Sequence, residues 1–436
     1  MKRLLLVNPW IYDFKAFDFW MKPMGLLYVA SMLRNSGYEV LLIDCLDRYH
    51  PLLLKEVSNL PKVDKYGRGK FYAEEIEKPE IFKNVKRIYK RYGMPKAVLH
   101  EILEDIEPPD VILVTSMMTY WYLGVKDTIK TIKEHFPETP VILGGIYATL
   151  CPDHAKEYSG ADIVMPGFAE KNLFSFFPKF KPMEFEDLPF PAFDLYAKLD
   201  YACVLTARGC PFKCSYCAVP KLCNGFVYRN PDSVLDEIEY YKSLGVSHIA
   251  FYDDALLANP NFPSILDGII QRGLKLSYHT PNGLHPRFID QEMAYKLFEA
   301  GYKTLYLSLE TVDPKVQKAT GAKVTNNEFV RAVEFLKSAG FQNEQIHTYL
   351  LIGTPYDSYE SIRSSIDFVH SLGSYAHLAE YSPIPGTLDY AKIGFSLDTD
   401  PLLHNNTIFP AINAKKRKEM ERIKIYLSRL RNDAIK

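Results

Sequence analysis

Short apolar runs alternate with helical stretches along most of the 436-residue chain. In the N-terminal part the apolar runs cover residues 3–9, 39–44, 111–115, 141–144 and 162–165. The helical stretches lie at 25–37, 123–135, 152–158 and 169–177. Strands that alternate with helices predict a parallel, doubly wound sheet, because parallel neighbours are joined through crossover helices.

A second series of apolar runs begins at residue 201 and also alternates with helical stretches. The six runs are 201–206, 247–252, 274–279, 302–308, 346–352 and 376–381. Six such repeats predict an open (βα)6 partial barrel. Barrel enzymes carry their chemistry at the carboxyl ends of the strands, so the residues that follow these runs are the candidates for a functional site.

Three cysteines follow the first run of this second series. They are Cys210, Cys214 and Cys217, with three and then two residues between them. Each thiolate can hold one iron of a four-iron cluster, and such a cluster ordinarily has four cysteine ligands. Three cysteines therefore leave one iron open to a further ligand.

The alternative for these cysteines is a structural zinc site that uses Cys203 or Cys223 as the fourth ligand. The chain would then be a non-catalytic protein that binds zinc or another cofactor. Zinc sites usually show two separated cysteine pairs, and no second pair follows later in the chain. Seven cysteines in 436 residues are also too few for the disulfide framework of a small secreted protein.

Together with Tyr216 before the last cysteine and the Arg208-Gly209 lead-in, the cysteine motif resembles the radical S-adenosylmethionine (SAM) superfamily. The resemblance implies an enzyme whose three cysteines bind a [4Fe-4S] cluster with SAM on the open iron. It implies that SAM is cleaved reductively to a 5'-deoxyadenosyl radical, which abstracts a hydrogen from the substrate. An external low-potential electron donor of the flavodoxin or ferredoxin type is implied as well.

The other strand ends carry residues that resemble the SAM contacts of that superfamily. The resemblance implies that Asp253 or Asp254 meets the SAM amino group, and that Glu310 binds the ribose hydroxyls. Taken singly, any of these residues could instead cap a helix or form a turn. The complete set of expected contacts is Tyr216, Asp253, Asp254, Asn282, Ser308, Glu310, Ile352 and Gly353.

The first strand of the chain is followed by Asn8-Pro9-Trp10 instead of the Gly-x-Gly-x-x-Gly turn of dinucleotide-binding folds, which argues against NAD. Gly144–Thr149 and Gly167–Glu170, with Pro23-Met24-Gly25, resemble the cobalamin-binding-type domain that precedes many radical SAM barrels. The Asp-x-His-x-x-Gly triplet whose histidine ligates cobalt is absent. Met117–Tyr122 places bulky side chains where a corrin would lie, so cobalamin stays an open cofactor and we favour its loss.

We expect four parts in the chain. The first is interrupted at about 46–109 by a charged insertion, whose stretch 82–92 is predicted to be helical. Near the C-terminus, 414–431 has one apolar helical face, which predicts a helix that docks on the domain body. The first part is a cobalamin-binding-type Rossmann-like domain at 1–178, followed by a linker at 179–200. A radical SAM partial barrel follows at 201–390, and a C-terminal helical extension at 391–436.

The overall charge gives no sign of a nucleic-acid or membrane partner, since the net charge is −1 and the pI is about 6.8. No apolar stretch reaches the eighteen residues of a membrane span, and Pro9 ends the first apolar run too early for a signal peptide. We therefore expect a cytoplasmic enzyme. The leading hypothesis is radical modification of an unidentified substrate at an unactivated carbon, and the alternative is cobalamin-dependent C-methylation.

Overall fold

The computed structural model describes residues 2–408 and 414–433 of the chain. Contacts between Cα atoms divide it into two compact units. The first unit is Met1–Ala202 with Leu397–Leu402, and the second unit is Cys203–Ser396 with Leu403–Lys436.

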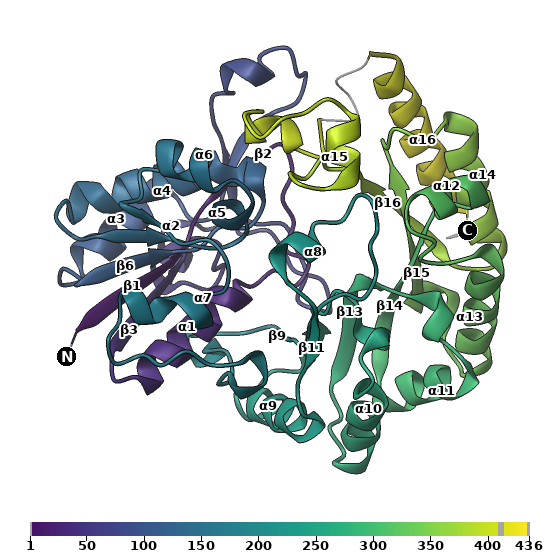
Figure 1. Ribbon diagram of the computed structural model, residues 1–436, viewed down its shortest axis with the longest axis horizontal. Coiled ribbons are helices and arrows are strands. Elements are labelled where there is room, and N and C mark those ends of the chain that lie inside the picture. The colour runs from purple at the N-terminus through teal and green to yellow at the C-terminus, as the bar shows by residue number, and fades with distance from the viewer. Residues whose placement is uncertain (1, 409–413, 434–436) are drawn as a thin grey trace. The chain divides into compact units, whose positions relative to one another are not determined.

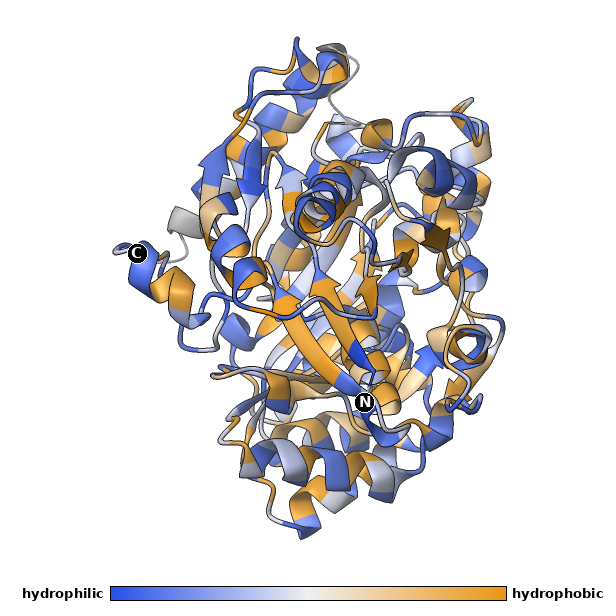
Figure 2. Ribbon diagram, turned by 90° about the vertical axis from the view of Figure 1, so that its left-hand side faces the viewer, coloured by the Kyte–Doolittle hydropathy of each residue, from blue (hydrophilic) through white to orange (hydrophobic). Residues whose placement is uncertain are grey.

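The first unit is built on a five-stranded parallel sheet in the order β3-β1-β6-β7-β8. Its interior strand β1 has four successive side chains with no exposed surface, and the sheet appears in Figure 2 as orange arrows beside the N-terminus. The predicted Rossmann-like sheet is confirmed. Its strands are β1 (Arg3–Asn8), β3 (Glu39–Asp44), β6 (Val111–Val114), β7 (Val141–Leu143) and β8 (Ile163–Val164), and its main helices are α1 (Met24–Asn35), α4 (Tyr122–His135) and α6 (Pro152–Tyr158).

The charged insertion contributes β4 and β5 to a small antiparallel sheet in the order β2-β5-β4, so the helix predicted over 82–92 is wrong. The rings of Phe82 and Tyr89 each lie 5.1 Å from the ring of Phe14, and the Arg91 guanidinium pairs with Glu74 on the neighbouring strand. These contacts with distant residues favour an extended chain there. The elements are β2 (Ile11–Asp13), α2 (Pro51–Glu56), β4 (Ala73–Glu75), η1 (Glu80–Phe82), β5 (Lys90–Tyr92) and α3 (Lys96–Glu104).

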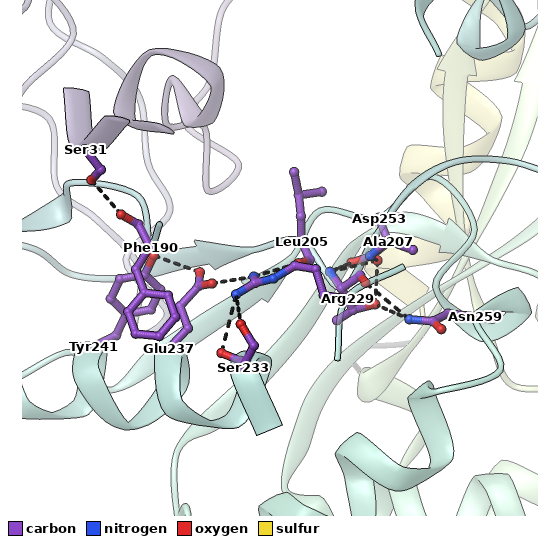
Figure 3. Close-up of polar contacts among 11 residues, drawn as sticks. Ser31, Phe190, Leu205, Ala207, Arg229, Ser233, Glu237, Tyr241, Asp253 and Asn259 are labelled. Carbon is purple, nitrogen blue, oxygen red and sulfur yellow. Dashed lines mark hydrogen bonds and ion pairs between the residues drawn. The ribbon is translucent and has the colours of Figure 1, made fainter. Parts of the chain in front are cut away.

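The segment 179–200 has no long helix or strand, yet it is firmly attached to the first unit. Asp194 accepts two hydrogen bonds from the Arg34 guanidinium, at 2.6 and 2.9 Å. The Tyr196 hydroxyl donates to Asp44 at 2.6 Å, and Ser31 donates to the carbonyl of Phe190 at 2.6 Å (Figure 3). The segment is therefore an ordered part of that unit.

The second unit is built on a six-stranded sheet in the order β16-β15-β14-β13-β12-β9, in which β12 to β16 pair in parallel. Helices α9, α10, α11, α13 and α14 line the outer side of this curved sheet (Figure 1), which confirms the predicted partial barrel. The strands are β9 (Ala202–Val204), β12 (His248–Phe251), β13 (Ser277–Leu284), β14 (Tyr302–Glu310), β15 (Ile346–Ile352) and β16 (Tyr375–Glu380). The helices are α9 (Pro231–Ser243), α10 (Phe262–Gln271), α11 (Gln291–Ala300), α13 (Asn326–Ser338) and α14 (Tyr359–Ser371).

Helix α16 (Ala414–Asp433) packs against α14 through one apolar face, as the sequence predicts. Met420, Ile423 and Leu427 on that face are buried. Lys424 forms an ion pair with Glu380 at the end of β16. Within the described part of the chain, no helix is both long enough and apolar enough to span a membrane.

Candidate cluster and cofactor site

The cysteine loop leaves the sheet through a short antiparallel hairpin formed by β10 (Ala207–Gly209) and β11 (Phe226–Tyr228). Gly209 has a φ of +88°, and a Cβ added there would lie 2.2 Å from the carbonyl oxygen of Gly225. Only glycine permits this close approach in that conformation. The hairpin thereby closes the two ends of the loop on each other.

The loop is held in place from its centre. The Ser215 N–H donates to the carbonyl of Thr320 at 3.2 Å, and the Ser215 hydroxyl donates to Asp389 at 2.8 Å. Cys203 and Cys223 are buried, and the Cys223 thiol lies 3.8 Å from the carbonyl oxygen of Gly225. The thiols that remain partly accessible on this loop are Cys210, Cys214 and Cys217.

The environment of these three thiols suits a cluster. Burial raises the pKa of all three thiols, to about 11 for Cys217. The charge of Cys214 raises the pKa of both Cys210 and Cys217, which shows that the three thiols are neighbours. Among the described residues, no three His, Cys, Asp or Glu side chains converge on one metal ion. A four-iron cluster does not need such convergence, because each cysteine binds a different iron. The donor set therefore fits a [4Fe-4S] cluster.

Tyr216 lies among the same groups. Its hydroxyl forms a hydrogen bond with Cys214, which lowers the pKa of that thiol against the effect of burial. The pKa of Tyr216 itself is raised well above its usual value, first by burial and then by the charge of Glu310. The Tyr216 side chain therefore lies near both the Cys214 thiol and Glu310 at the end of β14.

Asp253 is buried after β12, where its carboxylate anchors the start of the loop (Figure 3). One carboxylate oxygen accepts from the Thr206 N–H at 3.0 Å, from the Thr206 hydroxyl at 2.6 Å and from the Ala207 N–H at 2.6 Å. Desolvation by burial raises the pKa of Asp253 to about 7. These contacts give Asp253 a positioning role, while the SAM contact stays a prediction.

Asp254, the next residue, reaches solvent beside the cysteines. Its carboxylate accepts from the Gly209 N–H and lies near Arg208, while desolvation by the surrounding protein raises its pKa to about 6. Its charge raises the pKa of both Cys210 and Cys217. Of the two acids predicted to meet a SAM ammonium group, Asp254 is the exposed residue and Asp253 is buried.

Asn282 and Ser308 are both held by neighbouring protein groups. The Asn282 amide donates to the carbonyls of Tyr252 at 2.8 Å and Asp253 at 3.2 Å, which joins the ends of β12 and β13. The Ser308 hydroxyl accepts from Lys323 at 2.8 Å. Both residues lie at the carboxyl ends of strands as predicted, and their SAM contacts stay predictions.

Glu310 ends β14 in an unusual conformation. Its φ is +68°, and the pairing of β14 with β15 shifts register between Ser308 and Glu310. A residue other than glycine in this region costs about 1–3 kcal/mol, and such strain gathers at functional sites. The Glu310 carboxylate lies 3.3 Å from the Lys323 ammonium and borders a small cavity of about 20 Å³ with Tyr216 and Leu351.

The turn after β15 is stabilised by two hydrogen bonds to the Asp357 carboxylate. Gly353 has a φ of +83°, and its N–H donates to Asp357 at 2.6 Å. The Thr354 hydroxyl donates to the other oxygen of the same carboxylate at 3.0 Å. The carbonyl of Ile352 accepts from the Tyr381 N–H at 2.8 Å. The backbone of Ile352 and Gly353, which is predicted to contact SAM, is thus fixed on both sides.

Sequence reasoning missed Lys323. This residue lies between α12 (Pro314–Ala319) and α13, and its charge lowers the pKa of Cys210 and Cys214. It has no place in the strand-end pattern, because it reaches the site from a loop between two helices. No signal in the sequence distinguishes it from a surface lysine.

In the first unit, the loops after β6 and β7 touch each other. The Ser116 hydroxyl donates to the Gly144 carbonyl at 2.6 Å. Gly145 has a φ of +91°, and a Cβ there would lie 2.2 Å from the Ser116 carbonyl oxygen. The loops form a closely packed shelf at the carboxyl edge of the sheet, and Met118 beside Ser116 is 41% exposed. Ligands of such sheets bind at this edge.

The bulky side chains after β6 pack within the first unit. Tyr120 and Trp121 belong to a buried cluster with Ile11 and Phe71, and the Trp121 indole donates to Asp13 at 2.8 Å. These contacts turn them toward the insertion and remove the basis for expecting that they fill the space of a corrin. The turn after β1 is Pro9-Trp10 and contains no histidine that could bind cobalt. Trp10 is buried there, and its indole donates to the Met94 carbonyl at 2.8 Å.

Comparisons with known proteins match both units. The Radical SAM superfamily model matches residues 204–369, and the B12 binding domain model matches residues 92–173. An uncharacterized methyltransferase of Pyrococcus horikoshii is 24% identical, with 90% of this chain and 83% of that protein covered. The cytidylyl-2-hydroxyethylphosphonate methyltransferase of Streptomyces wedmorensis is 20% identical, with 88% and 80% covered.

A solved structure shares the fold. The radical SAM methyltransferase TsrM from Kitasatospora setae, with cobalamin and a [4Fe-4S] cluster bound, superposes with a TM-score of 0.65 at 18% identity, covering 90% of this chain and 78% of that one. Together with the cysteine loop, the two family models imply a [4Fe-4S] cluster, SAM and cobalamin as cofactors, and they leave no support for a zinc-binding protein. The chain belongs to the radical SAM superfamily, as an enzyme whose radical SAM domain follows a B12-binding domain.

Proposed function

We propose that this enzyme is a cobalamin-dependent radical SAM methyltransferase. The observation that carries the proposal is the presence of a B12-binding domain and a three-cysteine radical SAM loop in one chain. Two relatives that align over most of their length are named methyltransferases. Methyl transfer thereby replaces the more general radical modification of a carbon as the leading hypothesis.

When bound, the cluster and SAM supply the radical that removes a substrate hydrogen, and cobalamin supplies the methyl group. Cys210, Cys214 and Cys217 would hold the cluster. The protein fixes this loop through Thr206 and Asp253 at its start and through Ser215 at its centre.

Glu310 would orient SAM by accepting hydrogen bonds from the ribose. Its left-handed backbone interrupts the regular pairing of β14 with β15, and Lys323 balances its negative charge in a partly buried position. Asp254 would accept from the SAM ammonium group because it is an exposed acid whose charge acts on Cys210 and Cys217. An external low-potential donor of the flavodoxin or ferredoxin type would provide the electrons.

The test is anaerobic reconstitution of the full chain with iron, sulfide and hydroxocobalamin, followed by desalting. We expect about four irons and about one corrin per chain, and methyl transfer to cobalamin or substrate from methyl-labelled SAM. Cys214→Ala should lose iron and keep the corrin, because the two sites lie in different units. A chain that cleaves SAM yet retains no corrin would refute methyl transfer and restore radical modification without cobalamin.

A further inference from the structure

The insertion of the first unit lines an open cavity of about 330 Å³. None of the lining residues belongs to the cluster loop, to the strand ends of the barrel or to the shelf formed by Ser116 and Gly144. All of them fall between residues 48 and 72. The lining consists of Arg48, Tyr49, Leu60, Pro61, Lys62, Val63, Lys70 and Tyr72.

The walls of this cavity are held together from within the insertion. The Arg48 guanidinium donates to the carbonyl of Pro61 at 3.3 Å and to the carbonyl of Lys70 at 3.2 Å, so it ties the two sides to each other. The turn between these sides is closed by Asp64, which accepts from the Arg68 N–H at 3.0 Å and from the Arg68 side chain at 2.8 Å. The cavity is therefore formed before any ligand arrives, as most ligand sites are.

The charge of the lining is one-sided, with three basic residues and no acidic one. Arg48 is balanced by Asp18, whose carboxylate lies 3.7 Å from its guanidinium. Lys62 and Lys70 are exposed, and neither has an ion-pair partner among the described residues. Two uncompensated positive charges therefore stand at the cavity.

The rest of the lining is largely apolar. The Tyr72 hydroxyl donates to Glu74 at 3.2 Å, and the Tyr49 hydroxyl donates to Asp200. Both tyrosines direct their hydroxyls to carboxylates outside the lining, which leaves their rings as contact surface beside Leu60 and Val63. The Lys198 ammonium lies 4.2 Å from the centre of the Tyr49 ring and adds a further positive charge nearby.

We propose that this cavity binds a small amphipathic anion, with a flat apolar body against the tyrosine and aliphatic walls and a carboxylate or phosphate group between Lys62 and Lys70. The volume is at the lower end for small-molecule sites, which suits a single ring with a short anionic substituent. This site goes beyond the proposed methyl transfer, because its residues contribute nothing to the cluster or SAM.

Isothermal titration of the full, cluster-loaded chain tests this site with four probes. Phenyl phosphate and benzoate carry both features, phenol lacks the charge, and inorganic phosphate lacks the ring. We expect at least one of the two aromatic anions to bind at about one per chain, at least tenfold more tightly than phenol or inorganic phosphate. The comparison of phenyl phosphate with benzoate identifies the preferred anionic group.

The double variant Lys62→Gln/Lys70→Gln should weaken binding of the preferred anion at least tenfold. The matched control is Lys65→Gln, since Lys65 belongs to the same insertion, is exposed and is absent from the lining. Near-UV circular dichroism of all variants confirms that the fold is kept. Absence of binding by both aromatic anions, equal affinity for phenol, or an affinity that the double variant leaves unchanged would each overturn the proposal.

Discussion

The contacts of Asp253 predict opposite results for two substitutions that both remove its charge. Asp253→Ala leaves the N–H groups of Thr206 and Ala207 without their acceptor in a buried place. Each buried donor without a partner costs about 1–3 kcal/mol, so the expected loss is about 2–6 kcal/mol of the free energy of unfolding. That is a large part of the typical 5–15 kcal/mol, and the cysteine loop should lose its fixed start.

Asp253→Asn keeps an oxygen that can accept the same bonds. The carboxyl has a raised pKa of about 7 in the folded chain, against 3.8 for an ordinary aspartate. The folded state therefore holds the proton more tightly, so the carboxyl stabilises the fold below about pH 4, and this stabilisation is lost as the pH rises through 7. At 1.36 kcal/mol per pKa unit the loss is about 4 kcal/mol, which the asparagine variant should not show.

Urea denaturation of the apo chain between pH 4 and pH 8, with iron analysis after reconstitution, measures both effects. We expect the asparagine variant to match or exceed the parent stability at pH 8, to load its cluster and to bind SAM with an unchanged dissociation constant. The alanine variant should be destabilised and hold less iron. If the asparagine variant loaded a full cluster but bound SAM tenfold more weakly, Asp253 would contact SAM and the positioning role would be wrong.

The remaining predictions concern the cysteines and the end of β14. Cys214→Ala should abolish SAM cleavage, measured as 5'-deoxyadenosine, while Cys223→Ala should leave the cluster and its charge-transfer absorption intact; activity of the first variant would refute the ligand assignment. Glu310→Gly should raise the free energy of unfolding of the apo chain by up to about 1–3 kcal/mol, because glycine adopts the left-handed backbone without strain. The same variant should bind SAM about tenfold or more weakly, because the charged hydrogen bonds to SAM are lost. Equal SAM affinity would remove Glu310 from the site. Lys323→Met should lower the thermal midpoint of the apo chain, since it leaves the partly buried Glu310 carboxylate and the Ser308 hydroxyl without their donor; an unchanged midpoint would show that these contacts contribute nothing.

Some of the residues predicted to contact SAM form hydrogen bonds with other groups of the protein. Asn282 joins two strand ends, and Asp253 holds the first residues of the loop. These groups leave Glu310 and Asp254 as the acidic side chains that face the cysteines. A reactive cofactor is positioned well when the few groups that bind it are held by a rigid framework. Here Asn282 and Asp253 would supply the framework, and Glu310 and Asp254 the binding groups.

Local patterns determined much of this protein. The strands of both sheets follow from short apolar runs, because a strand buried on both faces must be apolar along its length. The three cysteines predicted to hold the cluster are so close in sequence that they must lie on one loop. Both inferences rest on neighbours in sequence, and the structure agrees with the strand positions within a few residues.

Tertiary structure alone decided the rest, because the responsible contacts join residues far apart in sequence. The stretch 82–92 has the composition of a charged helix, yet aromatic packing on Phe14 and the pairing of Arg91 with Glu74 draw it into a sheet. Likewise, Lys323 reaches the cysteines from a loop between two helices, and the left-handed backbone of Glu310 arises at a shift in the pairing of β14 with β15. Periodicity carries no information about such contacts, since it reports only which face of an element is buried.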